Sequence, residues 1–224
     1  MSAAVEVEIF VDTSCPYCHY GLATIRRLFH EMAADPDAPA LDPSWRFLRL
    51  FDLEPPEGLP RAAYQSARGR SAERISEINE ELRASAAAVG VRIDHERYLL
   101  VSNPLLAHRL LAIARDEPGD DVPDLWALTA AIWAATFARG LDLADLGALR
   151  VACEDSGLEV PQRLWDRLRD PDDYVSETLA DRTYAQSIDL DGVPRLRVGE
   201  TIIPAWRPTG EVRDAFHSAL AVVR

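Results

Sequence analysis

Two cysteines three positions apart are the residues in this sequence best suited to chemistry. Cys15 and Cys18 stand in the segment 12–19, directly after an apolar run at 5–11 and at the start of a helical pattern. At a helix start a sulfur faces unpaired backbone N–H groups and the positive end of the helix dipole, which favour its thiolate by about 0.3–1 kcal/mol. Pro16 suits the first helical position, where a missing N–H costs nothing. The pattern predicts thiol–disulfide exchange, with Cys15 as an exposed nucleophile and Cys18 as the cysteine that resolves a mixed disulfide.

A larger stabilisation of the Cys15 thiolate requires direct hydrogen bonds, which we expect from the N–H groups of Tyr17 and Cys18. The same spacing also occurs in zinc and haem sites. A zinc site needs two further ligands at matching spacing, but the only other cysteine is Cys153 and the remaining histidines are scattered. The Cys-x-x-Cys-His pattern at 15–19 also attaches haem, but the strand before it and the internal proline argue against that. We expect no metal and no bound cofactor, with a low-molecular-weight thiol as an alternative co-substrate.

Composition excludes several classes of partner. The 37 acidic and 24 basic residues give a net charge of −13, and every basic residue is an arginine. This charge argues against binding to nucleic acid or to an anionic membrane. No basic patch precedes an apolar region at the amino terminus, and no run approaches the ~18 apolar residues of a membrane span. We therefore expect a cytoplasmic protein acting on protein or small-molecule thiols and disulfides; composition does not indicate the oligomeric state.

The cysteine pair requires a strand before it and a helix after it, and both patterns are present. Residues 5–11 alternate as a strand does, and apolar residues at helical spacing predict a helix over 16–34. A second strand is predicted for 45–50. It leads into a proline-rich run at 53–60, which cannot form a helix or a central strand.

Helical patterns then continue to about residue 171. They cover about 75–90, 103–115 and 123–139, then a helix capped by Asp142 and one opened by Pro161. The pattern closes with a helix around 172–186, the sequence Gly-Val-Pro at 192–194, strands at 195–198 and 201–203, and a helix introduced by Pro208.

The chain resembles the DsbA-type thioredoxin-fold oxidoreductases, and more closely the branch named after FrnE. Three segments carry the resemblance: 12–21 around Cys-Pro-Tyr-Cys, 103–109 (Asn-Pro-Leu-Leu-Ala-His-Arg), and 192–194. The resemblance implies an α/β thioredoxin-like fold with a large all-helical domain inserted between its two halves. We expect a discontinuous thioredoxin-like domain, 1–60 and 172–224, and an inserted helical domain, 61–171.

The resemblance also implies roles for residues near the cysteines. It implies a cis bond between Val193 and Pro194, with Pro194 against the Cys15 sulfur and the backbone of Val193 open to an extended substrate. Pro16 and Tyr17 match the residues typical of glutaredoxins and are expected to contact substrate. This match leaves exchange with glutathione or another small thiol as an alternative to protein-disulfide exchange.

Two alternatives of other kinds stay open. The kappa-type, glutathione-dependent transferases and isomerases share the inserted helical domain, but they normally have serine where Cys15 stands. Their glycine- and aspartate-containing stretch after the last strand is replaced here by Pro-Ala-Trp-Arg at 204–207. The other alternative is a non-enzymatic, chaperone-like binding protein.

Several further residues have two interpretations each. His19 either contacts the thiolate or lies at the surface. Asn103 and His108 are singled out by the resemblance. Without it, His108 and Arg109 are a capped or satisfied polar pair in an apolar-rich helix. Arg195, where relatives commonly carry threonine, either receives a substrate carboxylate or faces solvent.

Two last residues are expected to have no catalytic role. Thioredoxin-like proteins often carry a buried acid six positions before the first cysteine, but that position here is Ile9. Strand alternation points the neighbouring Glu8 the other way, so we expect Glu8 to be a charged residue near the exposed end of its strand. Cys153 shares an apolar helical stripe with Leu146 and Leu149, and is expected to be a buried thiol.

Overall fold

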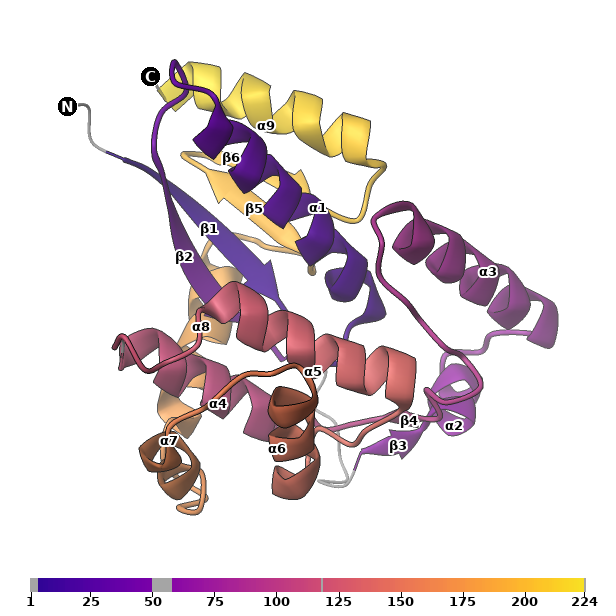
Figure 1. Ribbon diagram of the computed structural model, residues 1–224. Helices are drawn as coiled ribbons and strands as arrows, with labels where there is room; N and C mark the ends of the chain where they lie inside the picture. Colours follow the sequence, from indigo (N-terminus) through magenta and orange to yellow (C-terminus); the bar gives the residue numbers. More distant parts are fainter. Residues whose placement is uncertain (1–3, 50–57, 118, 224) are drawn as a thin grey trace.

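A four-stranded mixed sheet forms the centre of the computed structural model, which describes residues 4–49, 58–117 and 119–223 (Figure 1). The strand order is β2-β1-β5-β6, with β1 and β2 parallel and the other pairs antiparallel. The strands are β1 (Val5–Val11), β2 (Leu41–Phe47), β5 (Arg195–Val198) and β6 (Thr201–Pro204). Because β1 lies between two other strands, all its residues from Val7 onward are buried.

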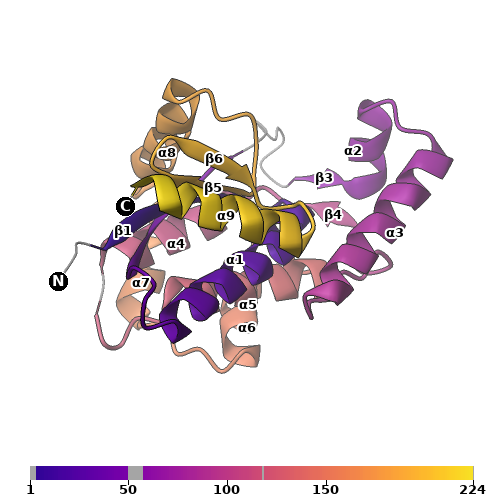
Figure 2. The same ribbon diagram turned by 90° about the horizontal axis from the view of Figure 1, so that it is seen from above.

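Two helices cover the face of the sheet that carries Ile9. They are α1 (Pro16–Ala34), which follows β1, and the last helix, α9 (Thr209–Val223), and they lie side by side in both views (Figures 1 and 2). Helix α8 (Val175–Ser187) covers the opposite face, where the Tyr184 ring stacks on Phe10 with ring centroids 6.2 Å apart. This is the thioredoxin-like arrangement that the sequence predicted, with both halves of the sheet joined in one layer.

The residues between β2 and α8 are mostly helical, as expected. They form α2 (Arg61–Ala67), α3 (Ala72–Ala88), α4 (Leu105–Asp116), α5 (Leu125–Arg139), α6 (Leu146–Asp155) and α7 (Gln162–Arg167). Helix α4 packs on β2, and α5 packs on α1. Within the described ranges, no helix has the length and apolar character needed to cross a membrane.

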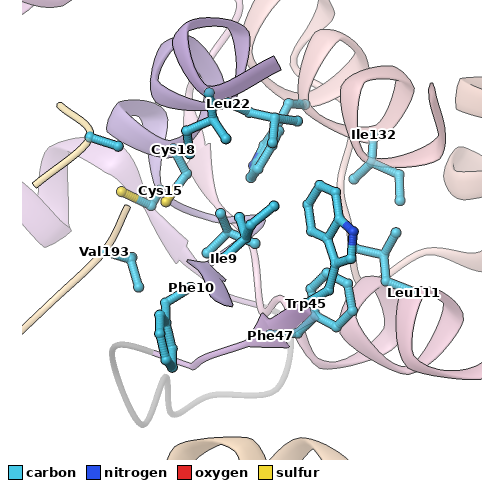
Figure 3. Packing of buried hydrophobic residues seen from close by; sticks show 14 of the residues in the cluster. Ile9, Phe10, Cys15, Cys18, Leu22, Trp45, Phe47, Leu111, Ile132 and Val193 are labelled. Atoms are coloured by element: carbon cyan, nitrogen blue, oxygen red, sulfur yellow. The ribbon is translucent and has the colours of Figure 1, made fainter. Parts of the chain in front are cut away.

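One hydrophobic core extends from the sheet into these helices. Trp126 of α5 contacts Trp45 of β2 and Phe29 of α1, with ring centroids 4.8 and 5.0 Å apart. Figure 3 shows residues of this core, among them Trp45 of β2, Leu111 of α4 and Ile132 of α5. Because the core is continuous, the proposed boundaries at 60/61 and 171/172 stay a prediction.

Four local expectations differ from the structure. The second strand begins at Leu41 and ends at Phe47, and its Pro43 is tolerated because β2 is an edge strand. Asp145 caps α6, whereas the carboxylate of Asp142 accepts from the N–H of Ala144 in the preceding turn. Helix α2 and a two-stranded sheet, β3 (Leu59–Pro60) with β4 (Leu100–Val101), were not expected. Most of the proline-rich run lies outside the described residues.

The prediction for Glu8 is wrong. Its side chain is buried, and its Oε2 atom accepts hydrogen bonds from Tyr184 Oη and Arg197 Nη1, both at 2.9 Å. The strand-alternation argument placed Glu8 on the correct face, away from α1. That face is covered by α8, however, so the carboxylate is paired with an arginine because an isolated buried charge would be too costly.

Candidate functional site

The site is built where β1 ends and α1 begins. Cys15 is the residue that precedes the first turn of α1, and Pro16 occupies the first helical position as expected. Cys15 is 8 % exposed, so the residue that the sequence predicts to be an exposed nucleophile is nearly covered. Within the first turn of α1, no backbone N–H donates to the Cys15 sulfur, and the N–H of Cys18 instead donates to the backbone oxygen of Cys15 at 3.0 Å. The expected N–H bonds to the thiolate are therefore absent from this arrangement.

Cys18 lies one turn further along α1 and is completely buried. Both cysteines are free thiols, which makes this the reduced form. Burial raises the pKa of the Cys18 thiol well above its usual value, and the adjacent Cys15 raises it further. The N–H of Asp12 points at the Cys18 sulfur at 3.4 Å, and this contact favours the thiolate when the proton leaves. Figure 3 shows the two sulfurs together beside Val193.

Three buried side chains hold the segment that joins β1 to Cys15. The Asp12 Oδ1 atom accepts hydrogen bonds from the N–H and the hydroxyl of Ser14, both at 2.8 Å. His108 of α4 accepts from the Thr13 N–H through Nε2 at 3.0 Å, and Trp133 of α5 donates to the Asp12 backbone oxygen at 3.3 Å. Helices from the middle of the chain therefore fix the loop that leads to Cys15.

His108 is a hydrogen-bonded polar residue, and its partner is the loop that leads to Cys15. Its side chain is fully buried and serves the cysteine loop directly, across 95 positions of sequence. The segment 103–109 otherwise serves the fold. Asn103 accepts from the N–H of Leu105 at 3.0 Å at the start of α4, and Arg109 donates to the backbone oxygens of Asp170 and Asp173 after α7.

A cavity of about 220 Å³ opens in front of Cys15. One wall is the start of α1, with Ser14, Pro16 and Tyr17, and Val193 also lines the cavity. The opposite wall comes from α2 and the segment after it, from α3 and from β4. Its lining residues are Arg61, Tyr64, Gln65, Arg68, Arg70, Ile78, Leu82, Tyr98 and Val101. Sequence reasoning missed this wall, because no spacing in the sequence relates α2 to Cys15.

The Val193–Pro194 bond is cis, as the resemblance implied. Val193 shares the cavity with Cys15, and the Pro194 backbone oxygen accepts from the N–H of Ala205 at 3.1 Å. Pro194 packs against α1 at Gly21, so closely that a Cβ atom on Gly21 would lie 2.6 Å from Pro194 Cγ. The use of this segment by substrate stays a prediction.

Neither interpretation of His19 holds. Its ring is buried against Phe137 and Trp133, with centroids 5.7 and 6.4 Å away, and its Nε2 lies 3.3 Å from the backbone oxygen of Arg92. Burial lowers the pKa of His19 to about 4. It points away from the thiols because it lies on the side of α1 that packs on α5.

Arg195 is also buried rather than solvent-facing. Its side chain forms an ion pair with Asp191, and its guanidinium carbon lies 3.9 Å from the centre of the Trp206 ring. Cys153 is buried in α6 as expected, and burial raises its pKa to about 12. In the part of the chain that the structure describes, no three His, Cys, Asp or Glu side chains group as metal ligands.

Comparison with known proteins finds similarity over most of the chain. Residues 6–217 match the model of the DSBA-like thioredoxin domain. A probable DsbA oxidoreductase from Streptomyces coelicolor has a similar structure, with a TM-score of 0.76, 24 % identity, and coverage of 97 % of this chain and 90 % of that one. Among curated proteins, no sequence matches the chain significantly.

Two more distant structures share the fold. The cytosolic disulfide reductase DsbM from Pseudomonas aeruginosa, solved with GSH, has a TM-score of 0.62 at 15 % identity, covering 98 % of this chain and 97 % of that one. A 2-hydroxychromene-2-carboxylate isomerase has a TM-score of 0.61 at 12 % identity, covering 97 % and 95 %. At these identities the likeness concerns the fold alone.

Proposed function

The chain belongs to the DSBA-like thioredoxin-domain family, and from this premise we propose that it is a thiol–disulfide oxidoreductase that uses Cys15 and Cys18. One observation carries the proposal. Cys15 lines an open cavity at the start of α1, whereas Cys18 is buried directly behind it and contacts the N–H of Asp12. This difference in access assigns the two sulfurs different tasks.

The exchange proceeds in two displacements. The Cys15 thiolate attacks one sulfur of a substrate disulfide, so that a mixed disulfide forms and the other substrate sulfur leaves as a thiolate. Cys18 then loses its proton and attacks the Cys15 sulfur, which releases the second thiolate and leaves a Cys15–Cys18 disulfide. The Asp12 N–H stabilises the Cys18 thiolate as it forms. Two electrons pass from the protein to the substrate, and the reverse sequence oxidises a dithiol.

The setting we propose is a reducing cytoplasm, and the finer assignment is the FrnE-like branch. The cytosolic DsbM structure supports such a setting for this fold. In a compartment where thiols are kept reduced, a Cys-x-x-Cys pair is more plausibly catalytic than structural.

Exchange with a small thiol is the second candidate function. The cavity beside Cys15 holds about 220 Å³, which is small even for a ligand pocket. DsbM, a structure with the same fold, was solved with GSH. A glutathione-type mixed disulfide would therefore suit the size of the site better than a folded loop of a protein.

An insulin-reduction assay tests the proposed function. The reduced protein should accelerate precipitation of the insulin chains in the presence of dithiothreitol, and Cys15→Ser should abolish that acceleration. Cys153→Ala is the matched control, because this thiol is buried and is not a lining residue of the cavity, so the rate should be unchanged. Full activity in Cys15→Ser would contradict the proposed role of Cys15, and no acceleration by the wild-type protein would favour a chaperone-like binding role.

A further inference from the structure

The cavity in front of Cys15 carries the opposite charge to the rest of the molecule. Three arginines, Arg61, Arg68 and Arg70, are in its described lining, and no Asp or Glu is. The whole chain has a net charge of −13 from 37 acidic residues. Positive charge gathered around a nucleophile in an acidic protein selects anions by local attraction.

Two of these arginines are bonded to neutral groups. Arg61 donates through Nη2 to the side-chain oxygen of Asn79, and Arg70 donates through Nη1 to Gln65 Oε1 at 2.7 Å. In the described structure no ion pair links either of them to a carboxylate. Arg163, by contrast, forms an ion pair with Asp121 on the surface. Among the described residues, Arg61 and Arg70 thus keep cationic charge that no ion pair neutralises.

Arg61 is also preorganised. Its guanidinium carbon lies 5.2 Å from the centre of the Tyr98 ring, and its Nη2 is held by Asn79. Partial burial lowers the pKa of this guanidinium from its usual value, which means that its charge is imperfectly solvated. A carboxylate arriving at this wall would restore the lost solvation and could form paired N–H bonds with the planar guanidinium.

Resting on the proposed exchange function, we propose that Arg61 and Arg70 bind a carboxylate of the substrate while its disulfide meets Cys15. The substrate class is a low-molecular-weight disulfide, or mixed disulfide, of a thiol that carries a carboxylate. The cavity volume favours a small molecule over a peptide segment. Reduction of one such disulfide releases two thiolates and oxidises Cys15 and Cys18 to their disulfide.

A single-turnover experiment with three small disulfides tests this inference. Pre-reduced protein is mixed with 3,3′-dithiodipropionate, 2-hydroxyethyl disulfide or cystamine, which are dianionic, neutral and dicationic. Each oxidation rate is divided by the rate of the same disulfide with dithiothreitol, which removes intrinsic differences in reactivity. We expect the dianion to react about tenfold faster than the neutral disulfide and the dication to react slowest.

Arginine variants test whether the cavity arginines cause this difference in rate. Arg61→Gln combined with Arg70→Gln should lower the dianion rate about tenfold and leave the rate of the neutral disulfide within about twofold. The preserved neutral rate also shows that the variant is folded. Arg163→Gln, at a surface ion pair outside the cavity lining, is the matched control and should change neither rate.

The outcomes separate the two proposals. Equal normalised rates for all three disulfides would overturn the carboxylate site and leave the exchange function intact. A preference for the dianion that persists in the double variant would overturn the assignment of the carboxylate site to Arg61 and Arg70. If none of the disulfides oxidises the protein, the exchange function itself is wrong, and the inference falls with it.

Discussion

At the scale of single residues, the loop before Cys15 is held by a buried histidine far away in sequence. The Thr13 N–H donates to His108 Nε2 at 3.0 Å, and the Asp12 Oδ1 atom lies 3.4 Å from the same nitrogen. The loop 12–14 is therefore held by an acceptor. His108 is a positioning residue in this account, because it touches neither sulfur through any described contact.

Two replacements of His108 distinguish the role of its acceptor atom from the role of the imidazole ring as a whole. His108→Leu leaves the Thr13 N–H buried without a partner, and should lower the free energy of unfolding by about 1–3 kcal/mol. His108→Gln keeps an acceptor oxygen at a similar reach and should recover most of that loss. Urea denaturation measures both, and the rate of Cys15 alkylation should follow the same order. If Gln is no better than Leu, His108 does not act through this hydrogen bond.

The burial of His19 predicts that the stability of the protein depends on pH. Burial lowers its pKa from 6.5 to about 4, so the unfolded chain binds the proton more readily than the folded protein. The stability contributed by the neutral ring is present above pH 6.5 and is lost as pH falls toward 4, by up to about 3 kcal/mol.

Urea denaturation at pH 7 and pH 4.5 measures this loss. His19→Gln keeps a donor for the Arg92 backbone oxygen and should show a smaller decrease in unfolding free energy over that range. His30→Gln is the control, because His30 lies exposed on the same helix and should leave the decrease unchanged. A His19→Gln variant with the wild-type decrease would show that this ring does not titrate as described.

At the scale of elements, the contact between α1 and the segment before β5 aligns the two halves of the site. A Cβ atom on Gly21 would lie 2.6 Å from Pro194 Cγ and 3.2 Å from the backbone oxygen of Ala205. Helix α1 therefore needs a glycine here in spite of the poor helix propensity of that residue. The close approach brings Val193 to the cavity that Cys15 lines.

Gly21→Ala tests this contact. The helix propensity of alanine favours the variant by about 1 kcal/mol, but overpacking costs about 1–3 kcal/mol, so we expect a net loss of stability and slower disulfide exchange. Gly210→Ala in α9 is the matched control. It meets nothing within 4 Å and should be neutral or stabilising by about 0.4–1 kcal/mol. A stabilised and fully active Gly21→Ala variant would contradict the close packing.

At the scale of the whole molecule, buried ion pairs join segments that are distant in sequence. Asp181 of α8 is 2 % exposed and accepts from Arg46 of β2 at 3.2 Å, from Arg115 of α4 at 2.9 Å and from the N–H of Phe47 at 3.1 Å. Arg46 and Arg197 also contact Glu8 of the central strand. This network fastens the helix that follows the proposed insertion to the strands that precede it.

Removing Asp181 should therefore have a large effect. Asp181→Ala leaves two arginines and a backbone N–H without their acceptor, and we expect it to lower the free energy of unfolding by about 3 kcal/mol. Asp121→Ala removes the exposed partner of Arg163 and should cost no more than about 1 kcal/mol. Equal losses in urea denaturation would mean that the buried network does not join the segments more strongly than a surface pair does.

Sequence reasoning reached the fold through local patterns and a family resemblance. Periodicity within one segment at a time predicts the strand before the cysteines and the helix after them. It likewise predicts the helices after residue 70 and the hairpin of the last two strands. The strand predicted at 45–50 spans Leu41–Phe47, and it includes Pro43 because an edge position tolerates a proline. The finer features of the site depend on tertiary contacts: burial of Glu8 under α8, the bond from His108 to Thr13, and the arginine wall from α2.

The assignment of roles to the two sulfurs is the central claim, and trapping of the mixed disulfide tests it most directly. Reduced proteins are mixed with 2-hydroxyethyl disulfide, whose neutrality makes the test independent of the arginines, and are examined by intact-mass spectrometry and peptide mapping. Wild type should form the Cys15–Cys18 disulfide without a lasting adduct, Cys18→Ala should keep one adduct on Cys15, and Cys15→Ala should stay unmodified. A stable adduct on Cys18 in Cys15→Ala, formed as fast as the adduct on Cys15, would contradict the account.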